Sequence, residues 1–219
     1  MNRTHSESLE DARASLLAEL AHDIADQRVL DAIGHVPREE FAGAEAAPVA
    51  YQNRPLPIGH GQTISQPLMV ALMTQALMLT GNERVLEVGT GSGYQAALIS
   101  LLAAHVVSVE RVPELAASAS ERLKRLGYSN VEVHAITDQL GWPDGAPYDA
   151  IIVTAASPDV PRPLLDQLAM NGRLVLPVGS RDIQELVRIV KTPEGAKRHN
   201  LGSCRFVPLL GSGAWPETR

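Results

Sequence analysis

Residues 85–94 read Val-Leu-Glu-Val-Gly-Thr-Gly-Ser-Gly-Tyr, a short apolar run that leads into three alternating glycines. The run before the glycines is typical of a buried β-strand, and the residues after them are typical of a helix. Glycine lets the backbone turn sharply and approach a ligand that a Cβ atom would exclude. The free N–H groups at the start of the helix add donors at the same place. This stretch predicts a strand, loop and helix that bind a nucleotide-like ligand, with a tight turn that binds nothing as the alternative.

The chain after this stretch alternates strand-like and helix-like segments, which is typical of a parallel sheet with helices on its faces. We expect strands at Arg84–Val88, Val106–Glu110, Val131–Ala135, Ala150–Thr154 and Arg173–Val178, and helices at Tyr94–Leu102, Pro113–Leu126 and Pro163–Leu168. Two further β-like runs, Glu185–Lys191 and Cys204–Leu209, flank a polar segment and predict an antiparallel C-terminal hairpin. The expected fold class is α/β, with a Rossmann-like, doubly wound and mostly parallel sheet.

The first third of the chain adds helices to this core. Periodic apolar residues predict helices over Ser8–Leu20 and Asp26–Val36. Prolines and glycines predict an irregular loop over Gly43–Gly61. The apolar segment Pro67–Leu79 is too short to span a bilayer, so we interpret it as a core helix.

The composition is that of a globular protein with one domain. The chain has 219 residues, of which 45% are hydrophobic and 20% charged, close to ordinary averages. We expect one domain over residues 1–219, with N-terminal helices and a substrate and cofactor loop in 1–65 and the Rossmann-like core in 66–219. A formal net charge of −6 and a pI near 5.6 argue against nucleic-acid binding, which needs clustered Lys and Arg. We expect no nucleic-acid partner and no membrane association.

Cysteine and histidine usage bears on the cellular compartment of the protein and on metal binding. The single cysteine, Cys204, cannot form an internal disulfide, which fits a reducing compartment. The N-terminal residues contain no apolar stretch of the kind found in a secretory signal. We therefore expect a cytoplasmic protein. The seven histidines show no pair at the spacing of metal ligands, so no metal site is expected.

The glycine loop and two nearby acids indicate which ligand is bound. A dinucleotide fingerprint is G-x-G-x-x-G, whereas Gly89, Gly91 and Gly93 form G-x-G-x-G. Glu87, just before the glycines, can accept hydrogen bonds or attract the ammonium of an amino-acid-like ligand. Glu110 ends the next strand, where an acid can bind both hydroxyls of a ribose; a surface charge is its other interpretation. S-adenosylmethionine has an ammonium and a ribose but no phosphate, so these features favour it as the ligand.

A series of motifs runs in order along nearly the whole chain. They are V-P-R-E-E-F at 36–41, R-P-L-P-I-G at 54–59, G-Q-T-I-S-Q-P at 61–67, the glycine stretch at 85–95, G-W-P at 141–143, A-P-Y-D-A-I-I-V-T-A-A at 146–156, G-R-L-V at 172–175 and R-F-V-P-L-L at 205–210. Together they resemble the protein-L-isoaspartate O-methyltransferase family of class I S-adenosylmethionine-dependent methyltransferases. Many methyltransferases share the glycine motif, whereas G-Q-T-I-S-Q-P is characteristic of this family.

The resemblance implies a repair enzyme. It implies methyl transfer from S-adenosylmethionine to the free α-carboxylate of L-isoaspartyl residues in damaged proteins or peptides, which leaves S-adenosylhomocysteine and starts repair through a succinimide. The partners are then isoaspartyl-containing proteins and peptides, and we expect a monomer. Two alternatives stay open. One is a carboxylate O-methyltransferase of a tailoring-pathway peptide, and the other is a degenerate protein that binds cofactor or isoaspartyl peptide without turnover.

The resemblance also implies roles for individual residues. Ser65 is implied to be catalytic and to orient one substrate carboxylate oxygen toward the methyl carbon, although it could instead cap the helix that follows. The implied cofactor-binding residues are Gln62, Thr63, Ile64, Ser65, Glu87, Gly89, Thr90, Gly91, Ser92, Gly93, Glu110, Arg111, Thr137 and Asp138. The implied substrate-binding residues are Pro57, Ile58, Gly59, Val207 and Leu209.

One segment departs from the family pattern. Family members usually carry Gly-Asp-Gly shortly before Gly-Trp, and its aspartate accepts a hydrogen bond from the adenine amino group. Here these positions hold Ile136, Thr137 and Asp138. A neutral hydroxyl is a weaker acceptor than a carboxylate. We therefore expect weaker cofactor binding than in relatives that have the usual triplet.

Overall fold

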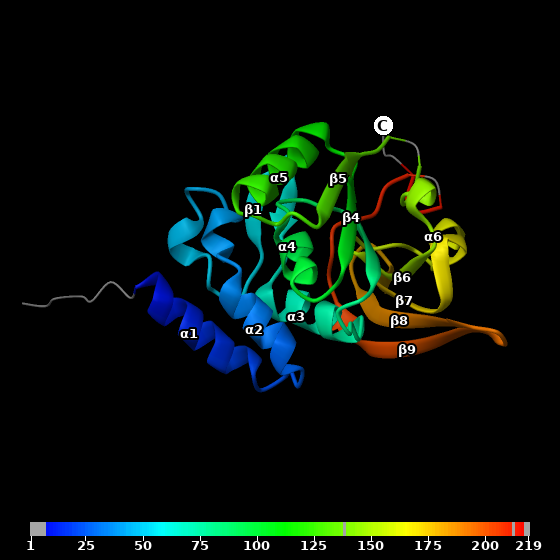
Figure 1. Ribbon diagram of the computed structural model, residues 1–219, viewed down its shortest axis with the longest axis horizontal. Coiled ribbons are helices and arrows are strands. Elements are labelled where there is room, and N and C mark those ends of the chain that lie inside the picture. The colour runs from blue at the N-terminus through cyan, green and yellow to red at the C-terminus, as the bar shows by residue number, and fades with distance from the viewer. Residues whose placement is uncertain (1–7, 138, 212, 217–219) are drawn as a thin grey trace, which may run out of the picture.

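The computed structural model describes residues 8–137, 139–211 and 213–216, and a seven-stranded sheet forms its centre (Figure 1). The strands are β3 (Arg84–Val88), β4 (His105–Glu110), β5 (Val131–Ala135), β6 (Tyr148–Val153), β7 (Leu168–Gly179), β8 (Gln184–Thr192) and β9 (Gly195–Cys204). Their order is β5-β4-β3-β6-β7-β8-β9. The pairs from β5 to β7 are parallel, and β7, β8 and β9 pair antiparallel. The predicted fold class is confirmed.

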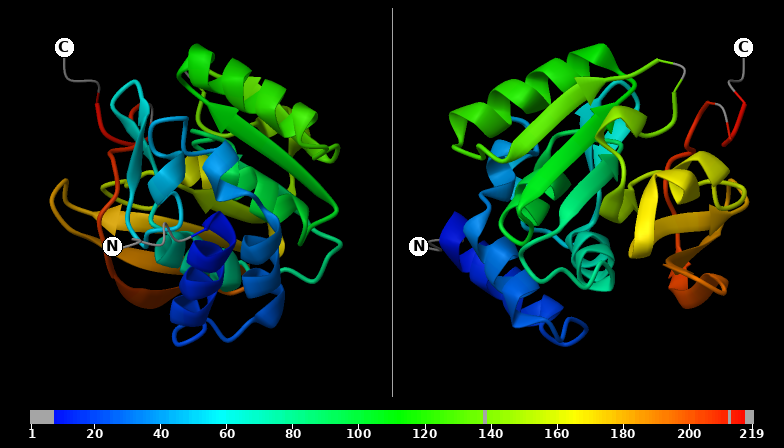
Figure 2. Two further views of the ribbon diagram at one scale, coloured as in Figure 1. Left: turned by 90° about the vertical axis from the view of Figure 1, so that its left-hand side faces the viewer. Right: turned by 45° about the vertical axis from the view of Figure 1, so that its right-hand side comes forward.

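Helices cover both faces of this sheet (Figures 1 and 2). They are α1 (Leu9–Leu20), α2 (Gln27–His35), α3 (Pro67–Ala76), α4 (Tyr94–Ser100), α5 (Pro113–Arg125) and α6 (Arg162–Gln167), with short 3₁₀ helices η1 (Arg38–Glu40), η2 (Ala47–Val49) and η3 (Pro143–Gly145). All the predicted helices are present, with ends that differ by a few residues. No helix in the described part of the chain is long and apolar enough to cross a membrane.

Alternation along the strands divides the core into two layers. Val85 belongs to the apolar cluster that contains the buried residues of α1 to α4. Its neighbour Leu86 points to the other face and belongs to the cluster that contains Leu164 of α6. This period of two is what a strand buried on both faces requires. β3 is therefore packed on both faces at the centre of the sheet, just before the glycine loop.

The strand order reverses at β3. From β3 the chain moves outward to β4 and β5 and then returns to the other side of β3 as β6. The carboxyl ends of β3, β4 and β6 therefore face one crevice, which is the usual ligand position in open α/β sheets.

The predicted irregular loop over Gly43–Gly61 is wrong in part. It contains η2 and β1 (Leu56–Gly59), which pairs antiparallel with β2 (Gln62–Ile64). Positive φ angles at residues 59–61 make the tight turn. The prolines argued against a strand because Pro has no N–H to donate to a neighbouring strand. In a separate two-stranded ribbon each strand has one unpaired edge, and Pro is tolerated there.

The predicted strand Cys204–Leu209 is also wrong. The second strand of the hairpin is β9, whose residues are almost all exposed, whereas the apolar residues after Cys204 leave the sheet. Val207 and Leu209 instead make backbone hydrogen bonds to Ala156 at 2.7 and 2.6 Å. An exposed edge strand needs no apolar alternation, so the polar sequence of β9 carried no strand signal.

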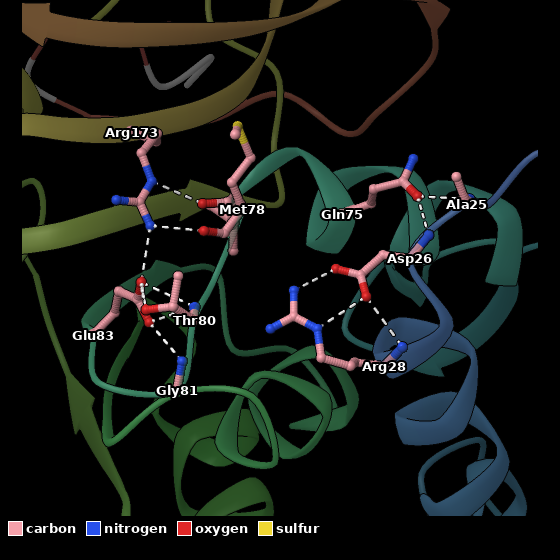
Figure 3. A network of polar contacts seen from close by, with 10 residues as sticks. Ala25, Asp26, Arg28, Gln75, Met78, Thr80, Gly81, Glu83 and Arg173 are labelled. Atoms are coloured by element: carbon pink, nitrogen blue, oxygen red, sulfur yellow. Dashed lines mark hydrogen bonds and ion pairs between the residues drawn. The ribbon is translucent and has the colours of Figure 1, made fainter.

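A polar network ties the loop between α3 and β3 to the sheet (Figure 3). Arg173 of β7 donates to the carbonyls of Leu77 and Met78 at 2.8 and 3.1 Å and pairs with Glu83 at 3.2 Å. The Glu83 carboxylate also accepts from the N–H groups of residues 80 and 81. Burial alone would raise the pKa of Glu83, but these hydrogen bonds lower it to about 2.

Candidate functional site

A pocket of about 360 Å³ opens at the carboxyl ends of β3, β4 and β6, a size that suits a small-molecule ligand. Its walls come from the glycine loop, the β2 segment, the loop after β5 and the C-terminal segment around residues 207–211. Of the predicted cofactor residues, those that line it are Gln62, Thr63, Ile64, Ser65, Glu87, Gly89, Thr90, Gly91, Ser92, Glu110, Arg111 and Thr137. Asp138 lies outside the described residues.

The glycine loop needs its glycines for two different reasons. Gly89 has a φ of 100°, and a Cβ atom there would overlap the hydroxyl of Thr154. That hydroxyl donates to the carbonyl of Gly89 at 2.7 Å and so braces the loop. Gly93 does not line the pocket; it has a φ of 89°, and a Cβ atom there would press on Leu123 of α5. Gly89 therefore keeps the pocket wall close to the sheet, and Gly93 lets the chain turn into α4.

Glu87 is a fully buried acid in the wall of the pocket. Burial raises its pKa to about 8; the charge of Glu110 adds to this shift, and the hydrogen bond from Ser108 opposes it. The Ser108 hydroxyl donates to Oε2 at 2.5 Å, and the hydroxyl of Thr90 lies 2.6 Å from that of Ser108. Oε1 has no hydrogen-bond partner among the described residues. One oxygen of a buried carboxyl group is thus free for a ligand.

Glu110 is buried rather than a surface charge, with 7% of its surface exposed. Its carboxylate accepts from the N–H of Gly91 at 2.9 Å and from the N–H of Val112 at 3.0 Å. It thereby joins the end of β4 to the glycine loop and lines the pocket between them. A carboxylate oxygen has two lone pairs, so this anchoring leaves acceptor capacity for the hydroxyls of a ligand.

Ser65 follows β2 and is half-buried in the pocket wall. Its carbonyl accepts from Nη2 of Arg38 at 2.7 Å. The N-cap of α3 is the next residue, Gln66, and the N–H of Leu68 in the first turn donates to Oδ1 of Asn53 at 3.0 Å rather than to Ser65. The capping interpretation of Ser65 is therefore wrong.

The predicted substrate residues divide between two neighbouring cavities. Val207 and Leu209 line the main pocket. Pro57 and Ile58 line a second cavity of about 280 Å³, which shares Gly91 and Ser92 of the glycine loop with the main pocket. Gly59 lines neither of these two cavities and forms part of the turn between β1 and β2.

Sequence reasoning missed several residues of the main pocket. Thr154 follows the end of β6, and the rule that ligands bind at the carboxyl ends of switch-point strands would have found it. Met73 belongs to the predicted core helix Pro67–Leu79, and it is buried and also lines the pocket. Gln139 and Leu140 follow the loop after β5 and carried no signal of their own. No group of three His, Cys, Asp or Glu that could hold a metal occurs within the described residues.

Comparisons with known proteins agree along nearly the whole chain. The family model described as protein-L-isoaspartate(D-aspartate) O-methyltransferase matches residues 12–214. Protein-L-isoaspartate O-methyltransferase 1 of Syntrophobacter fumaroxidans is 54% identical over 196 residues, which cover 90% of this chain and 92% of that protein. The protein-L-isoaspartate O-methyltransferase of Methanoculleus marisnigri is 53% identical over 195 residues, 89% of each.

Two solved structures are similar to this one. A protein-L-isoaspartate O-methyltransferase superimposes with a TM-score of 0.81 at 29% identity, over 92% of this chain and 67% of that one. A putative protein-L-isoaspartate O-methyltransferase from Plasmodium falciparum, solved in complex with S-adenosyl-L-homocysteine, gives a TM-score of 0.75 at 28% identity, over 89% and 96% of the two chains.

Proposed function

Because the chain belongs to the protein-L-isoaspartate(D-aspartate) O-methyltransferase family, we propose that its main pocket is the place of methyl transfer. The reaction moves a methyl group from S-adenosylmethionine to the free α-carboxylate of L-isoaspartyl residues in damaged proteins, and the ester leads to repair through a succinimide. The observation that carries the proposal is that the glycine loop, Glu110 and Ser65 line a single pocket.

The pocket residues fit this cofactor. The free Oε1 of buried Glu87 is an acceptor for an ammonium group, and the loop at Gly89 lets the backbone come close to a ligand. We assign Glu110 to the ribose hydroxyls and the loop that contains Thr137 and Asp138 to the adenine. When bound, S-adenosylmethionine supplies an electrophilic methyl group and leaves as S-adenosylhomocysteine.

Ser65 is assigned to the substrate. An isoaspartyl α-carboxylate has a pKa of about 3.5 and is ionised at neutral pH, so its attack needs no general base. The carboxylate oxygen forms the new bond to the methyl carbon while the carbon–sulfur bond breaks and its electron pair stays on sulfur. The Ser65 hydroxyl would hold one carboxylate oxygen in line for this attack, which is a proximity effect.

The peptide is assigned to the open end of the pocket. Val207 and Leu209 line the pocket, and their backbone hydrogen bonds to Ala156 keep the C-terminal segment in place.

In this proposal residues 1–65 and 66–219 form one domain; the first part supplies Ser65 and the second the glycine loop. The expected form is a cytoplasmic monomer.

The test is methyl transfer from labelled S-adenosylmethionine to an isoaspartyl peptide and to its normal aspartyl twin. We expect label in the first peptide only, because a cleft shaped for a backbone lengthened by one methylene misplaces the shorter one. Equal rates on both peptides would contradict the repair function. Cofactor binding without turnover on either peptide would instead favour the degenerate binding protein.

A further inference from the structure

Arg38 is a fully buried cation that lies behind the wall of the pocket rather than in it. It belongs to η1, and 0% of its surface is exposed. It forms no ion pair within residues 8–137, 139–211 and 213–216. Burial lowers the pKa of its guanidinium. Burying an unpaired charge is unfavourable, so the hydrogen bonds and ring contact of Arg38 must matter to the fold around it.

Those contacts join three segments that are far apart in the sequence. Nε donates to the carbonyl of Ala50 at 2.8 Å, and Nη2 donates to the carbonyl of Ser65 at 2.7 Å. The guanidinium carbon lies 4.8 Å from the centre of the Tyr94 ring. Tyr94 is the first residue of α4, directly after the last glycine of the loop, and it lines the pocket. One side chain thus contacts both the Ser65 segment and the end of the glycine loop.

A second residue of the same turn strengthens this link. Phe41 follows η1, and its ring packs edge-on against Tyr94 with the ring centres 5.6 Å apart. The turn therefore holds Tyr94 through Arg38 and through Phe41. The guanidinium donates from separate nitrogens, Nε to Ala50 and Nη2 to Ser65, whereas the single ammonium nitrogen of a lysine offers all its donors from one point.

We propose that Arg38 is a positioning residue for methyl transfer, one that fixes the carbonyl of Ser65 relative to the glycine loop. This inference rests on the proposed function, because it assigns Arg38 an effect through the Ser65 hydroxyl. In-line attack tolerates little displacement, and an error of about 1 Å costs on the order of 100-fold in rate. Loss of the hydrogen bonds from Arg38 to the carbonyls of Ala50 and Ser65 should therefore lower turnover and spare cofactor binding.

The first experiment compares Arg38→Lys with Arg173→Lys. Arg173 is a matched control because it also donates to two backbone carbonyls, those of Leu77 and Met78, and it does not line the main pocket. We expect Arg38→Lys to lower kcat about 10- to 100-fold, with a calorimetric Kd for S-adenosylhomocysteine within about threefold of the parent. Arg173→Lys should leave kcat unchanged. An unchanged kcat in Arg38→Lys overturns the inference, even if the melting temperature falls.

The second experiment asks whether Arg38 acts through Ser65. Arg38→Lys is introduced into Ser65→Ala, and the two single variants complete a double-mutant cycle. If Arg38 positions the hydroxyl, its substitution should change kcat less than threefold once that hydroxyl is absent. Fully multiplicative losses would show an independent effect and overturn the inference. Should Arg38→Lys not fold, Phe41→Leu loosens the same turn; a lower kcat at unchanged cofactor Kd supports the inference, and an unchanged kcat overturns it.

Hydrogen exchange separates this inference from the proposed function. If the parent protein does not methylate the isoaspartyl peptide, the proposed function fails, and backbone exchange then decides about Arg38. We expect the amides of residues 62–66 to exchange faster in Arg38→Lys than in the parent and in Arg173→Lys. Equal exchange in these three proteins would overturn the positioning role.

Discussion

In the proposed function the Ser65 hydroxyl lies beside a nucleophile that is already ionised, so its removal should affect geometry rather than proton transfer. We predict that Ser65→Ala lowers kcat about 10- to 100-fold and changes the Kd for S-adenosylhomocysteine less than threefold. Steady-state kinetics and calorimetry measure the two quantities. Gln66 rather than Ser65 is the N-cap of α3, and Asn53 accepts from the N–H of Leu68 in its first turn, so the melting temperature should stay near that of the parent. A lower melting temperature with normal turnover would contradict this role.

Glu110 combines two tasks in one carboxylate, since it anchors the glycine loop and faces the pocket. Glu110→Ala leaves the N–H groups of Gly91 and Val112 without their acceptor and removes the proposed ribose acceptor. Hydrogen bonds to charged groups contribute about 1.5–3 kcal/mol, so we predict a 10- to 150-fold weaker cofactor affinity. Glu114→Ala, an exposed acid in the first turn of α5, is the control. Unchanged calorimetric affinity in Glu110→Ala would remove Glu110 from the cofactor site.

Single residues were predictable where the local pattern carries their role. Glu110 was found because an acid that ends an apolar strand is unusual, and the structure has it buried. Thr154 and Arg38 were not found, because their importance depends on partners 65 and 27 positions away. Such contacts depend on which strands and turns are neighbours, and the local sequence pattern does not contain that information.

At the scale of elements, the sequence predicted the strands that have apolar runs or alternation and missed two strands that lack them. The strands β3, β4 and β6 have apolar residues that a buried parallel strand requires. β9 is polar and lies at the edge of the sheet, and β1 contains a proline. Hydrophobic periodicity measures burial, so it does not detect strands of this kind.

The loop after β5 is the element where this chain departs from its family pattern. We predict that installing Gly-Asp-Gly through Ile136→Gly, Thr137→Asp and Asp138→Gly tightens cofactor binding about tenfold. The reason is that a carboxylate acceptor for the adenine amino group contributes ~1.4 kcal/mol more than a neutral hydroxyl. Calorimetric titration with S-adenosylhomocysteine measures the change.

A control variant separates charge from backbone freedom in this loop. Ile136→Gly with Asp138→Gly adds the two glycines and leaves Thr137 in place. Its affinity should stay below that of the triple variant, since it gains no carboxylate at position 137. If the triple variant binds no tighter than the parent, Thr137 or Asp138 already serves the adenine and the alignment of this loop with the family triplet is wrong.

At the scale of the whole molecule, the topology assembles the site. The reversal of strand order at β3 brings the ends of β3, β4 and β6 to one crevice. The N-terminal residues add Ser65 to one wall, and the C-terminal segment adds Val207 to another. The sequence predicted the parallel strands of this sheet because each of them has its own apolar pattern, but the closure of the pocket by the N-terminal and C-terminal segments came only from the family resemblance.

Two buried acids give the cofactor-free protein opposite pH dependences of stability. The folded pKa of Glu83 is about 2, below the ordinary 4.5, because hydrogen bonds overcome the effect of burial. Its contribution to stability is therefore complete above pH 4.5 and is lost as the pH falls toward 2. The folded pKa of Glu87 is about 8 because of burial. Its contribution is complete below pH 4.5 and is lost as the pH rises through 8, because the folded state holds a proton that the unfolded state has released.

We predict that Glu87→Gln and Glu83→Gln change the pH profile of unfolding in opposite directions. Between pH 5 and 8, the free energy of unfolding of the parent should fall relative to Glu87→Gln by up to about 1.4 kcal/mol per pH unit, the slope for one bound proton. Relative to Glu83→Gln, the free energy of unfolding of the parent should stay constant between pH 5 and 8 and fall only below pH 4.5. Urea unfolding of the cofactor-free proteins at each pH gives both differences. Parallel profiles for the parent and Glu87→Gln from pH 5 to 8 would show that the Glu87 carboxyl is already ionised in the folded protein, and that the pocket wall carries its charge before any ligand arrives.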